Sequence, residues 1–392
     1  MLSMECNCSQ KGHSAPIKVL EVSENAIEKV VDILSDYNRI YMVADKNTYE
    51  VAGKKVEKML KEAGKLSHIC IIDEPALPTN ANVGKVLIEA GIDRENYDIN
   101  AFSYNPDYIL AVGSGSVNDI CRMVSYRMGL EYGVVGTAPS MDGYVSVVAP
   151  LINGNRKIVY TCSVARHIII DLNICAGAPY ELLLAGVGDM IGKYVAILDW
   201  ELSQKLTGEY YCEKVANMVL EATEKCITSA VSLKEREIET IENTIDGLIL
   251  SGLGIAYTGS SRPASGTEHM VGQTWEIMDV EKGKVPNLHG VEVGEATFAA
   301  IVMYKKLYEE TNETWLKELI GKYIPAFEKI LELQKQIKIP FTVTDKDKFI
   351  EGVLRGRTFR VRYTLLQYLY DRGQLQEYAE FAYEETMKYN VG

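Results

Sequence analysis

Residues 107–119 read Asp-Tyr-Ile-Leu-Ala-Val-Gly-Ser-Gly-Ser-Val-Asn-Asp. The apolar run is typical of a buried strand, and the residues after the glycines have the pattern of a helix start. Glycines at such a turn let backbone N–H groups approach a diphosphate, and the helix N-terminus adds positive potential. The stretch therefore predicts a parallel α/β sheet that holds a nucleotide at this turn.

The turn is not a complete dinucleotide fingerprint. Asn118 stands where the third glycine of Gly-x-Gly-x-x-Gly belongs, and the turn does not follow the first strand of the chain. We expect Ser116 to be the N-cap of the helix and Asp119 to complete a capping box. A tight strand–helix turn without a ligand is the alternative.

Strand and helix patterns alternate on both sides of this stretch. Further β-rich runs lie at 16–22, 39–44, 67–72 and 132–136, and amphipathic segments lie at 25–35, 47–63, 82–90 and 117–128. Such alternation predicts a parallel sheet with helices on both faces. We expect residues 157–162 and 166–171 to form a hairpin that closes this half.

Helical patterns dominate from Pro179 onward. They lie near 181–206, 210–233, 238–256, 290–309, 314–333, 347–352 and 362–388. The predicted fold is therefore an α/β dinucleotide-binding domain over 1–176 and an all-α metal-binding and substrate domain over 177–392. A cleft between the two is the expected ligand site.

Composition narrows the class of protein. The chain has 392 residues, 47% of them hydrophobic, and a formal net charge of −13, which argues against nucleic-acid or anionic-membrane partners. No apolar run reaches the ~20 residues of a membrane span. Eight cysteines without a framework spacing predict reduced thiols and a cytoplasmic protein. Cys6, Cys8 and His13 lack zinc-finger spacing, so we expect a flexible or loosely docked N-terminus.

Polar side chains follow two other predicted strands. Asp45 ends the strand at 39–44, where a carboxylate can bind an adenosine ribose and repel a 2′-phosphate, which favours NAD over NADP. A helix N-cap is the alternative for Asp45. Thr137, Ser140 and Asp142 follow the strand at 132–136, at the sheet edge where ligands bind. An ordinary loop is the alternative there.

Asp189, His269 and His289 form the candidate metal site. The chain has only five histidines, and each of these three residues lies beside glycine or at a predicted helix start. Two imidazoles and a carboxylate are a usual ligand set for a catalytic divalent metal that keeps a position open. A core or surface position is the alternative for each histidine, since spacing alone does not show that the three converge.

Four segments make the pattern specific. They are Gly-Ser-Gly-Ser-Val-Asn-Asp-Ile (113–120), Thr-Ala-Pro-Ser-Met-Asp-Gly-Tyr (137–144), Gly-Val-Gly-Asp-Met-Ile-Gly-Lys (186–193) and Gly-Ser-Ser-Arg-Pro-Ala-Ser-Gly-Thr-Glu-His (259–269). Over nearly its whole length the chain resembles the sn-glycerol-1-phosphate dehydrogenase family, in particular its bacterial, arabinose-operon-associated branch. The wider group comprises iron-dependent alcohol dehydrogenases, glycerol dehydrogenases and dehydroquinate synthases.

The resemblance implies a role for each matching residue. It implies metal ligation by Asp189, His269 and His289, cofactor binding by Gly113, Gly115, Ser116 and Asn118, and places for Thr137, Ser140 and Asp142 beside the nicotinamide and substrate. Iron-dependent alcohol dehydrogenases carry a fourth ligand, a histidine, where this chain has Lys193. This departure favours zinc or nickel over iron.

The implied reaction interconverts dihydroxyacetone phosphate and sn-glycerol 1-phosphate with NAD(H), or with NADP(H), in a homodimer. We expect Asp142 to orient a substrate hydroxyl, and Lys193 and Arg262 to bind the substrate phosphate. A structural ion pair is the alternative for each of these two cations. The arginines near residues 355–362 are interpreted as a solvated face or a subunit contact. A glycerol or other polyol dehydrogenase is the alternative function. A dehydroquinate-synthase-like lyase or a non-enzymatic cofactor-binding homologue would belong to another class.

Overall fold

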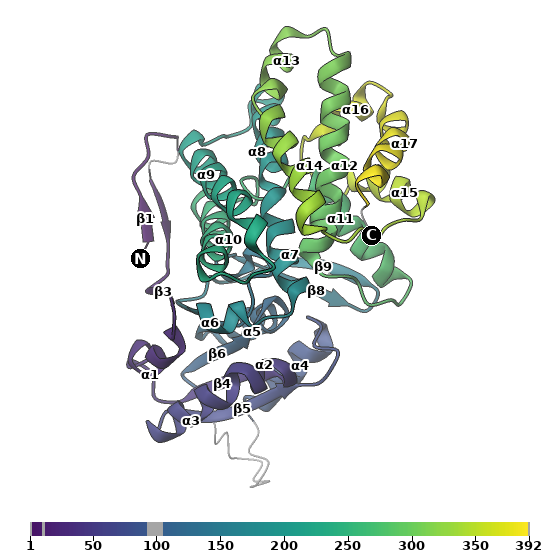
Figure 1. The fold of residues 1–392 in the computed structure, drawn as a ribbon. Helices are drawn as coiled ribbons and strands as arrows, with labels where there is room; N and C mark the ends of the chain where they lie inside the picture. The colour runs from purple at the N-terminus through teal and green to yellow at the C-terminus, as the bar shows by residue number, and fades with distance from the viewer. Residues whose placement is uncertain (1, 10–11, 92–104, 391–392) are drawn as a thin grey trace. The chain divides into compact units, whose positions relative to one another are not determined.

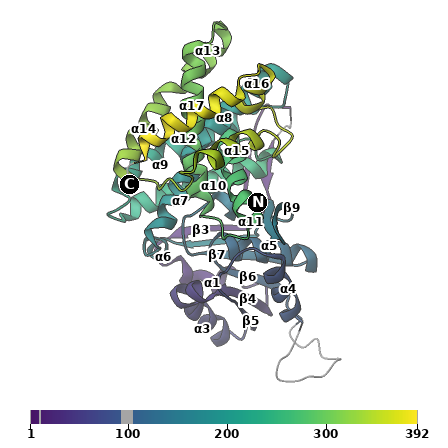
Figure 2. The ribbon, with the colours of Figure 1, turned by 90° about the vertical axis from the view of Figure 1, so that its right-hand side faces the viewer.

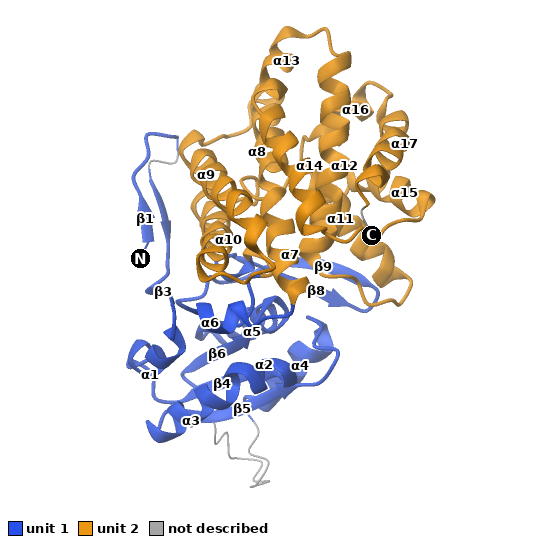
Figure 3. Cartoon of the chain, viewed as in Figure 1, with its two compact units in different colours: residues 1–139, 143–179 blue, residues 140–142, 180–392 orange. Residues whose placement is uncertain are grey.

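The computed structural model describes residues 2–9, 12–91 and 105–390. The chain divides into two compact units, 1–139 with 143–179 and 140–142 with 180–392 (Figure 3). The division therefore falls after Pro179, slightly beyond the expected 176. Residues 140–142 belong to the helical unit because Asp142 is bonded within it, with its backbone N–H 2.9 Å from Asp189 Oδ2.

A six-stranded parallel sheet forms the centre of the first unit (Figure 1). Its order is β3 (Val19–Ser23), β10 (His167–Asp171), β7 (Glu131–Gly136), β6 (Tyr108–Gly113), β4 (Ile40–Asp45) and β5 (Leu66–Ile72). Strands β4, β6 and β10 are buried along almost their whole length, as expected for a parallel sheet covered on both faces. The chain leaves β4 for β5 and then returns to β6 on the other side of β4. This reversal is the topological switch point, where ligands bind in open α/β sheets.

Short helical elements cover the sheet. They are η1 (Ala26–Lys29), α1 (Val30–Ile33), α2 (Lys46–Thr48), the π-helical η2 (Tyr49–Gly53), α3 (Lys54–Glu62), α4 (Asn80–Glu89), α5 (Gly115–Met128), η3 (Asp142–Tyr144) and α6 (Leu172–Ala176). Figure 2 shows α1 and α3 on one face of the sheet and α4 and α5 on the other. Alternate residues of β4 serve the two faces: Met42 packs with Val30 and Val56, whereas the Tyr41 hydroxyl donates to Val86 O of α4.

The expected hairpin of residues 157–162 with 166–171 is wrong. β9 (Arg156–Thr161) pairs antiparallel with β8 (Val148–Asn153), and β10 joins the main sheet between β3 and β7. The true turn is at Asn153-Gly154, where Gly154 has φ 63°. An Asn-Gly pair of this kind is a strong hairpin signal. The unbroken apolar run of β10 is the pattern of an interior parallel strand instead.

The N-cap predicted for the nucleotide turn is also wrong. Ser114, not Ser116, caps α5, and its hydroxyl accepts from the N–H of Gly115 at 2.6 Å. Asp119 does not complete a capping box but pairs with Arg122 at 2.6 Å. A Cβ on Gly113 would lie 2.8 Å from the Val117 side chain. Helix α5 thus starts at once after β6, and only glycine fits at the turn.

Helices make up the second unit. They are α7 (Tyr180–Ile191), α8 (Lys193–Thr207), α9 (Glu213–Ser229), η4 (Ala230–Ser232), α10 (Ile238–Thr258), α11 (Thr267–Glu281), α12 (His289–Glu310), α13 (Thr314–Gly321), α14 (Ile324–Ile337), α15 (Lys346–Gly356), α16 (Leu365–Asp371), α17 (Leu375–Thr386) and η5 (Met387–Tyr389). Several expected helices are divided; the one at 181–206, for example, breaks at Gly192. Near the N-terminus β1 (Leu2–Met4) pairs with β2 (His13–Ala15). His13 and Ala15 are buried, so this segment is not flexible or loosely docked, as the sequence analysis expected. No helix in the described ranges has the length and apolar character needed to span a membrane.

Helices α7 and α12 cross at glycines. A Cβ on Gly188 would lie 2.2 Å from Gly290 O, and one on Gly290 would lie 1.9 Å from Ala185 O. The two backbones therefore approach as closely as glycine permits. Asp189 follows one of these glycines and His289 precedes the other, so the crossing sets the distance between these two side chains.

Candidate functional site

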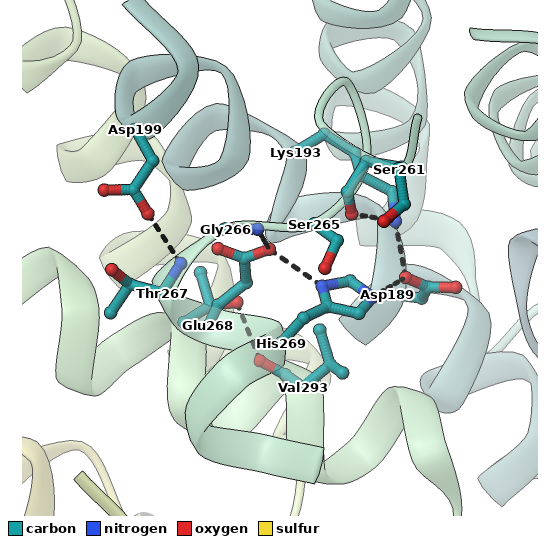
Figure 4. Close-up of polar contacts among 12 residues, drawn as sticks. Asp189, Lys193, Asp199, Ser261, Ser265, Gly266, Thr267, Glu268, His269 and Val293 are labelled. Atoms are coloured by element: carbon teal, nitrogen blue, oxygen red, sulfur yellow. Dashed lines mark hydrogen bonds and ion pairs between the residues drawn. The ribbon is translucent and has the colours of Figure 1, made fainter. Parts of the chain in front are cut away.

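Asp189, His269 and His289 converge in the helical unit. One ligand atom from each lies within 4.8 Å of the others. Asp189 Oδ1 is 3.5 Å from His269 Nε2 (Figure 4). The ring centroids of His269 and His289 are 5.3 Å apart. They come from the end of α7, the first turn of α11 and the first residue of α12. A carboxylate and two imidazoles at this spacing fit a divalent metal, with positions left for substrate.

A buried glutamate orients each histidine. His269 Nδ1 is 2.7 Å from Glu268 Oε1, and His289 Nδ1 is 2.6 Å from Glu276 Oε1. Since Nδ1 donates to a carboxylate, Nε2 is the nitrogen left to ligate. Sequence reasoning missed both glutamates. The available signal was position: Glu268 precedes one ligand, and Glu276 lies about two turns after His269 on the same face of α11.

Lys193 occupies the centre of an ionic cluster beside Asp189. Its ammonium donates to Asp189 Oδ1 at 2.6 Å, Asp142 Oδ2 at 2.9 Å and Ala264 O at 3.2 Å. The Lys193 side chain is fully buried, and these bonds use all its N–H donors. Burial alone would raise the pKa of Asp189, but the charge of Lys193 and the two histidines outweighs it and holds that pKa at about 2.

This geometry does not support the phosphate roles expected for Lys193 and Arg262. Lys193 has no donor to spare. Arg262 forms a bidentate ion pair with Glu209, at 2.8 Å and 2.5 Å, and also donates to Tyr363 O and Ser203 Oγ. Both cations are therefore neutralised inside the fold, a role that charge along a sequence cannot reveal.

Arg360 and Arg362 do not form the solvated face that was one of two interpretations of the arginines near residues 355–362; the other, a subunit contact, stays a prediction. Both are only partly exposed and donate to Ser261 Oγ. Ser261 belongs to the loop between α10 and α11 that leads to His269. By contrast, Arg355 pairs with Glu281 and Glu351 at the surface, as the interpretation expected.

Asp142 keeps one carboxylate oxygen for a ligand. Its Oδ2 accepts from Lys193 Nζ and from Ser251 Oγ at 2.7 Å. Within the described ranges, no protein donor is recorded for Oδ1. Because Asp142 N also binds Asp189 Oδ2, the side chain is fixed beside the candidate metal ligands.

The nucleotide turn lies in the first unit, at the carboxyl ends of neighbouring strands. Gly113 ends β6 and Asp45 ends β4, on the two sides of the switch point. At the N-terminus of α5 the N–H of Gly115 donates to Ser114, whereas no partner for the N–H groups of Ser116 and Val117 is found within the described ranges, which leaves these two for a diphosphate. Asp45 caps α2 through Oδ1, 2.9 Å from Thr48 N, and no partner for Oδ2 is recorded in the described part of the chain. The capping role thus leaves an oxygen for a ribose.

Three other residues expected near the cofactor occupy different places. Asn118 is buried and donates to Gly143 O at 3.1 Å, a bond that supports the loop. Thr137 follows β7, with its N–H 3.3 Å from Gly113 O. Ser140 belongs to the helical unit. Of these three, Thr137 and Asn118 are bonded to the glycine turn, Thr137 to Gly113 O and the N–H of Asn118 to Ser114 O at 3.0 Å.

Comparisons with known proteins agree with this architecture. A family model described as iron-containing alcohol dehydrogenase matches residues 21–179. A glycerol-1-phosphate dehydrogenase [NAD(P)+] from Halalkalibacterium halodurans is 32% identical, over 81% of this chain and 78% of that protein. A protein of the same name from Pyrococcus furiosus is 30% identical, over 88% of this chain and 91% of that protein.

Solved structures reproduce the fold at low sequence identity. A probable glycerol dehydrogenase from Sinorhizobium meliloti has a TM-score of 0.70 at 15% identity, over 95% of this chain and 98% of that one. A glycerol dehydrogenase from Schizosaccharomyces pombe has a TM-score of 0.67 at 14% identity, over 96% of this chain and 93% of that one.

Proposed function

The chain belongs to the glycerol-1-phosphate dehydrogenase family, and from this premise we propose that it interconverts dihydroxyacetone phosphate and sn-glycerol 1-phosphate by hydride transfer at C2. The observation that carries the proposal is the convergence of Asp189, His269 and His289 within 4.8 Å. Glycerol dehydrogenase, the alternative, is favoured only by structures at 14–15% identity, which share the fold alone.

Different residues of the site would bind different parts of the ketone substrate. A divalent metal bound by Asp189, His269 and His289 would supply Lewis-acid polarisation of the C2 oxygen. Asp142 Oδ1 accepts a hydrogen bond from the substrate hydroxyl beside C2. Lys193 pairs with both carboxylates and fixes their positions, so that the site is set before substrate arrives.

Metal identity is the finer part of this proposal. We propose zinc or nickel rather than iron, because Lys193 stands where iron-dependent alcohol dehydrogenases have a fourth, histidine ligand. The buried ammonium of Lys193 lies beside Asp189, in the place that this histidine would take. Metal content after reconstitution with equal zinc, nickel and iron tests this preference.

The cofactor, assembly and location are proposed on the same basis. NAD(H) is the preferred cofactor because of Asp45, although relatives are named for both NAD and NADP. A homodimer is expected, and light scattering tests it. A cytoplasmic location is supported by eight cysteines that are all free thiols.

Product stereochemistry tests the reaction. Product made from dihydroxyacetone phosphate and NADH is offered to a dehydrogenase specific for sn-glycerol 3-phosphate. We expect no oxidation of the product by that enzyme, whereas authentic sn-glycerol 3-phosphate is consumed. Complete oxidation would contradict the assignment.

His269→Ala and His289→Ala should lose both metal and turnover, since either removes one of the three proposed ligands.

A further inference from the structure

Arg360 and Arg362 donate to the same acceptor, the hydroxyl oxygen of Ser261. Arg360 Nη1 donates to Ser261 Oγ at 2.8 Å, and Arg362 Nη2 donates to the same oxygen. Their other recorded bonds also go to neutral groups: Arg360 Nη2 to Gln273 Oε1 at 3.2 Å, and Arg362 Nη1 to Ser265 O at 2.9 Å. Within the described part of the chain, neither guanidinium forms an ion pair with a carboxylate.

Such a pair is unusual in a chain of net charge −13. The neighbouring Arg262 has Glu209, and the surface Arg355 has Glu281. For Arg362, burial and then the charges of Arg360 and Arg262 lower the pKa to about 9. Two guanidiniums held together without a carboxylate in contact cost free energy, because charges removed from water need pairing. An anionic ligand would supply that pairing.

Arg362 and Lys193 bind neighbouring carbonyl groups of the loop between α10 and α11. Lys193, which binds Asp189, donates to Ala264 O, and Arg362 donates to the adjacent carbonyl of Ser265. The Ser265 side chain is also left without a partner: its hydroxyl is buried and makes no hydrogen bond in the described ranges. Figure 4 shows that hydroxyl directed toward His269. Ser265 thus carries an unsatisfied hydroxyl directed toward His269 and a carbonyl that Arg362 binds.

We propose that Arg360 and Arg362, with the Ser265 hydroxyl, bind the phosphate of the substrate while its C2 oxygen faces Asp189, His269 and His289. Guanidinium groups match phosphate oxygens bidentately, and Ser261 Oγ and Gln273 Oε1 hold the two forks in place until the dianion arrives. This inference rests on the proposed function and names the residues that select a phosphorylated ketone over an unphosphorylated one.

Steady-state kinetics of single variants test the assignment. Arg360→Gln and Arg362→Gln should each raise the KM for dihydroxyacetone phosphate about ten- to hundredfold, the usual loss for a charge-assisted contact. The kcat/KM for dihydroxyacetone should change by less than about twofold, since it carries no phosphate. Arg360→Lys and Arg362→Lys should recover part of the loss, because a point charge remains. Arg355→Gln is the matched control, with no change specific to phosphate.

Direct binding of inorganic phosphate provides a second readout. Phosphate should raise the unfolding temperature of the unmodified protein and compete with dihydroxyacetone phosphate, and both effects should weaken in Arg362→Lys. This conservative variant also serves if a glutamine variant fails to fold.

The outcomes separate the inference from the function on which it rests. Equal losses on both substrates, or an unchanged phosphate effect in Arg362→Lys, would overturn the phosphate assignment while leaving the dehydrogenase intact. If the unmodified enzyme turned over dihydroxyacetone better than its phosphate, the proposed function itself would be wrong.

Discussion

Each imidazole of the candidate metal site is fixed by one carboxylate, and the sequence alone did not reveal this. Asp189, His269 and His289 were predicted as a set, and the fold brings their ligand atoms together. Glu268 and Glu276 were not predicted, because a sequence does not show whether a glutamate in a helix faces solvent or an imidazole. Lys193 and Arg262 were expected to bind phosphate for a related reason. The sequence shows that both side chains are charged, but it does not show that Asp142 and Glu209 are their partners.

The orienting role of Glu276 leads to a test of metal affinity. Glu276→Gln should weaken metal binding about ten- to hundredfold, since loss of a carboxylate behind a ligating imidazole has that effect. Competition with a coloured chelator measures the affinity without any assay of turnover. Glu281→Gln, at the end of the same helix and paired with Arg355 at the surface, is the control. Equal affinity in Glu276→Gln and the unmodified protein would refute the role.

Asp45 permits a clean test of cofactor preference. Asp45→Ser removes the charge but retains an N-cap residue for α2, so stability should change little. The preference for NADH over NADPH, as a ratio of kcat/KM values, should narrow because repulsion of the 2′-phosphate is lost. Thr48→Ala breaks the capping box and keeps the carboxylate, so the ratio should stay as it was. An unmodified enzyme that already uses NADPH equally well would show that Asp45 does not discriminate.

At the scale of elements, the parallel sheet was predictable and one connection was not. The β4 and β6 runs were placed within one residue, because continuous apolar segments between helical patterns are distinctive. The hairpin was misplaced because two β-rich runs with a short gap look like partners. Strand order, which sets β10 between β3 and β7, depends on contacts far apart in the sequence.

His167 at the start of β10 makes the first unit sensitive to acid. Burial first, and then the charge of Lys18, lower its pKa from 6.5 to about 4. The surrounding ionisable groups are Lys18, Asp36, Tyr37, Tyr108, Glu131 and Arg166. A lowered histidine pKa stabilises the fold fully above pH 6.5, and this contribution is lost as pH falls toward 4, because only the unfolded chain then binds the proton.

A substitution isolates this effect. His167→Asn retains an acceptor for the Tyr108 hydroxyl, which is 2.7 Å from His167 Nδ1. Urea unfolding between pH 7 and pH 4 should show a smaller loss of stability in the variant, by up to about 3 kcal/mol. Identical pH profiles for the two proteins would mean that His167 is not buried as a neutral imidazole.

The crossing of α7 and α12 links packing to the metal site. Gly188→Ala places a methyl group against Gly290 O, so the helices must separate. We expect a loss of about 1–3 kcal/mol in the free energy of unfolding, together with weaker metal binding because Asp189 moves away from His289. Gly84→Ala in α4 is the control: its Cβ meets open space, so it should stabilise by about 0.5–1 kcal/mol. Normal metal affinity in Gly188→Ala would show that the crossing does not set the ligand spacing.

For the whole molecule, the sequence predicted an α/β half followed by a helical half, and the compact units have this order. It could not predict that residues 140–142 group with the helical unit, because that depends on bonds from Asp142 to Asp189 and Lys193. The candidate metal ligands, the glutamates that bond the two histidines and the proposed phosphate arginines thus all belong to one unit, and the candidate nucleotide turn belongs to the other.

The central claim is that this metal site reduces a phosphorylated ketone. Its most direct test is NADH oxidation by metal-free protein reconstituted with zinc, nickel or iron, with dihydroxyacetone phosphate compared against dihydroxyacetone. We predict no turnover without metal, turnover with zinc or nickel, and a kcat/KM for the phosphate at least about tenfold higher, as one charge-assisted contact provides. Equal or better turnover of dihydroxyacetone, or full activity without metal, would contradict the account.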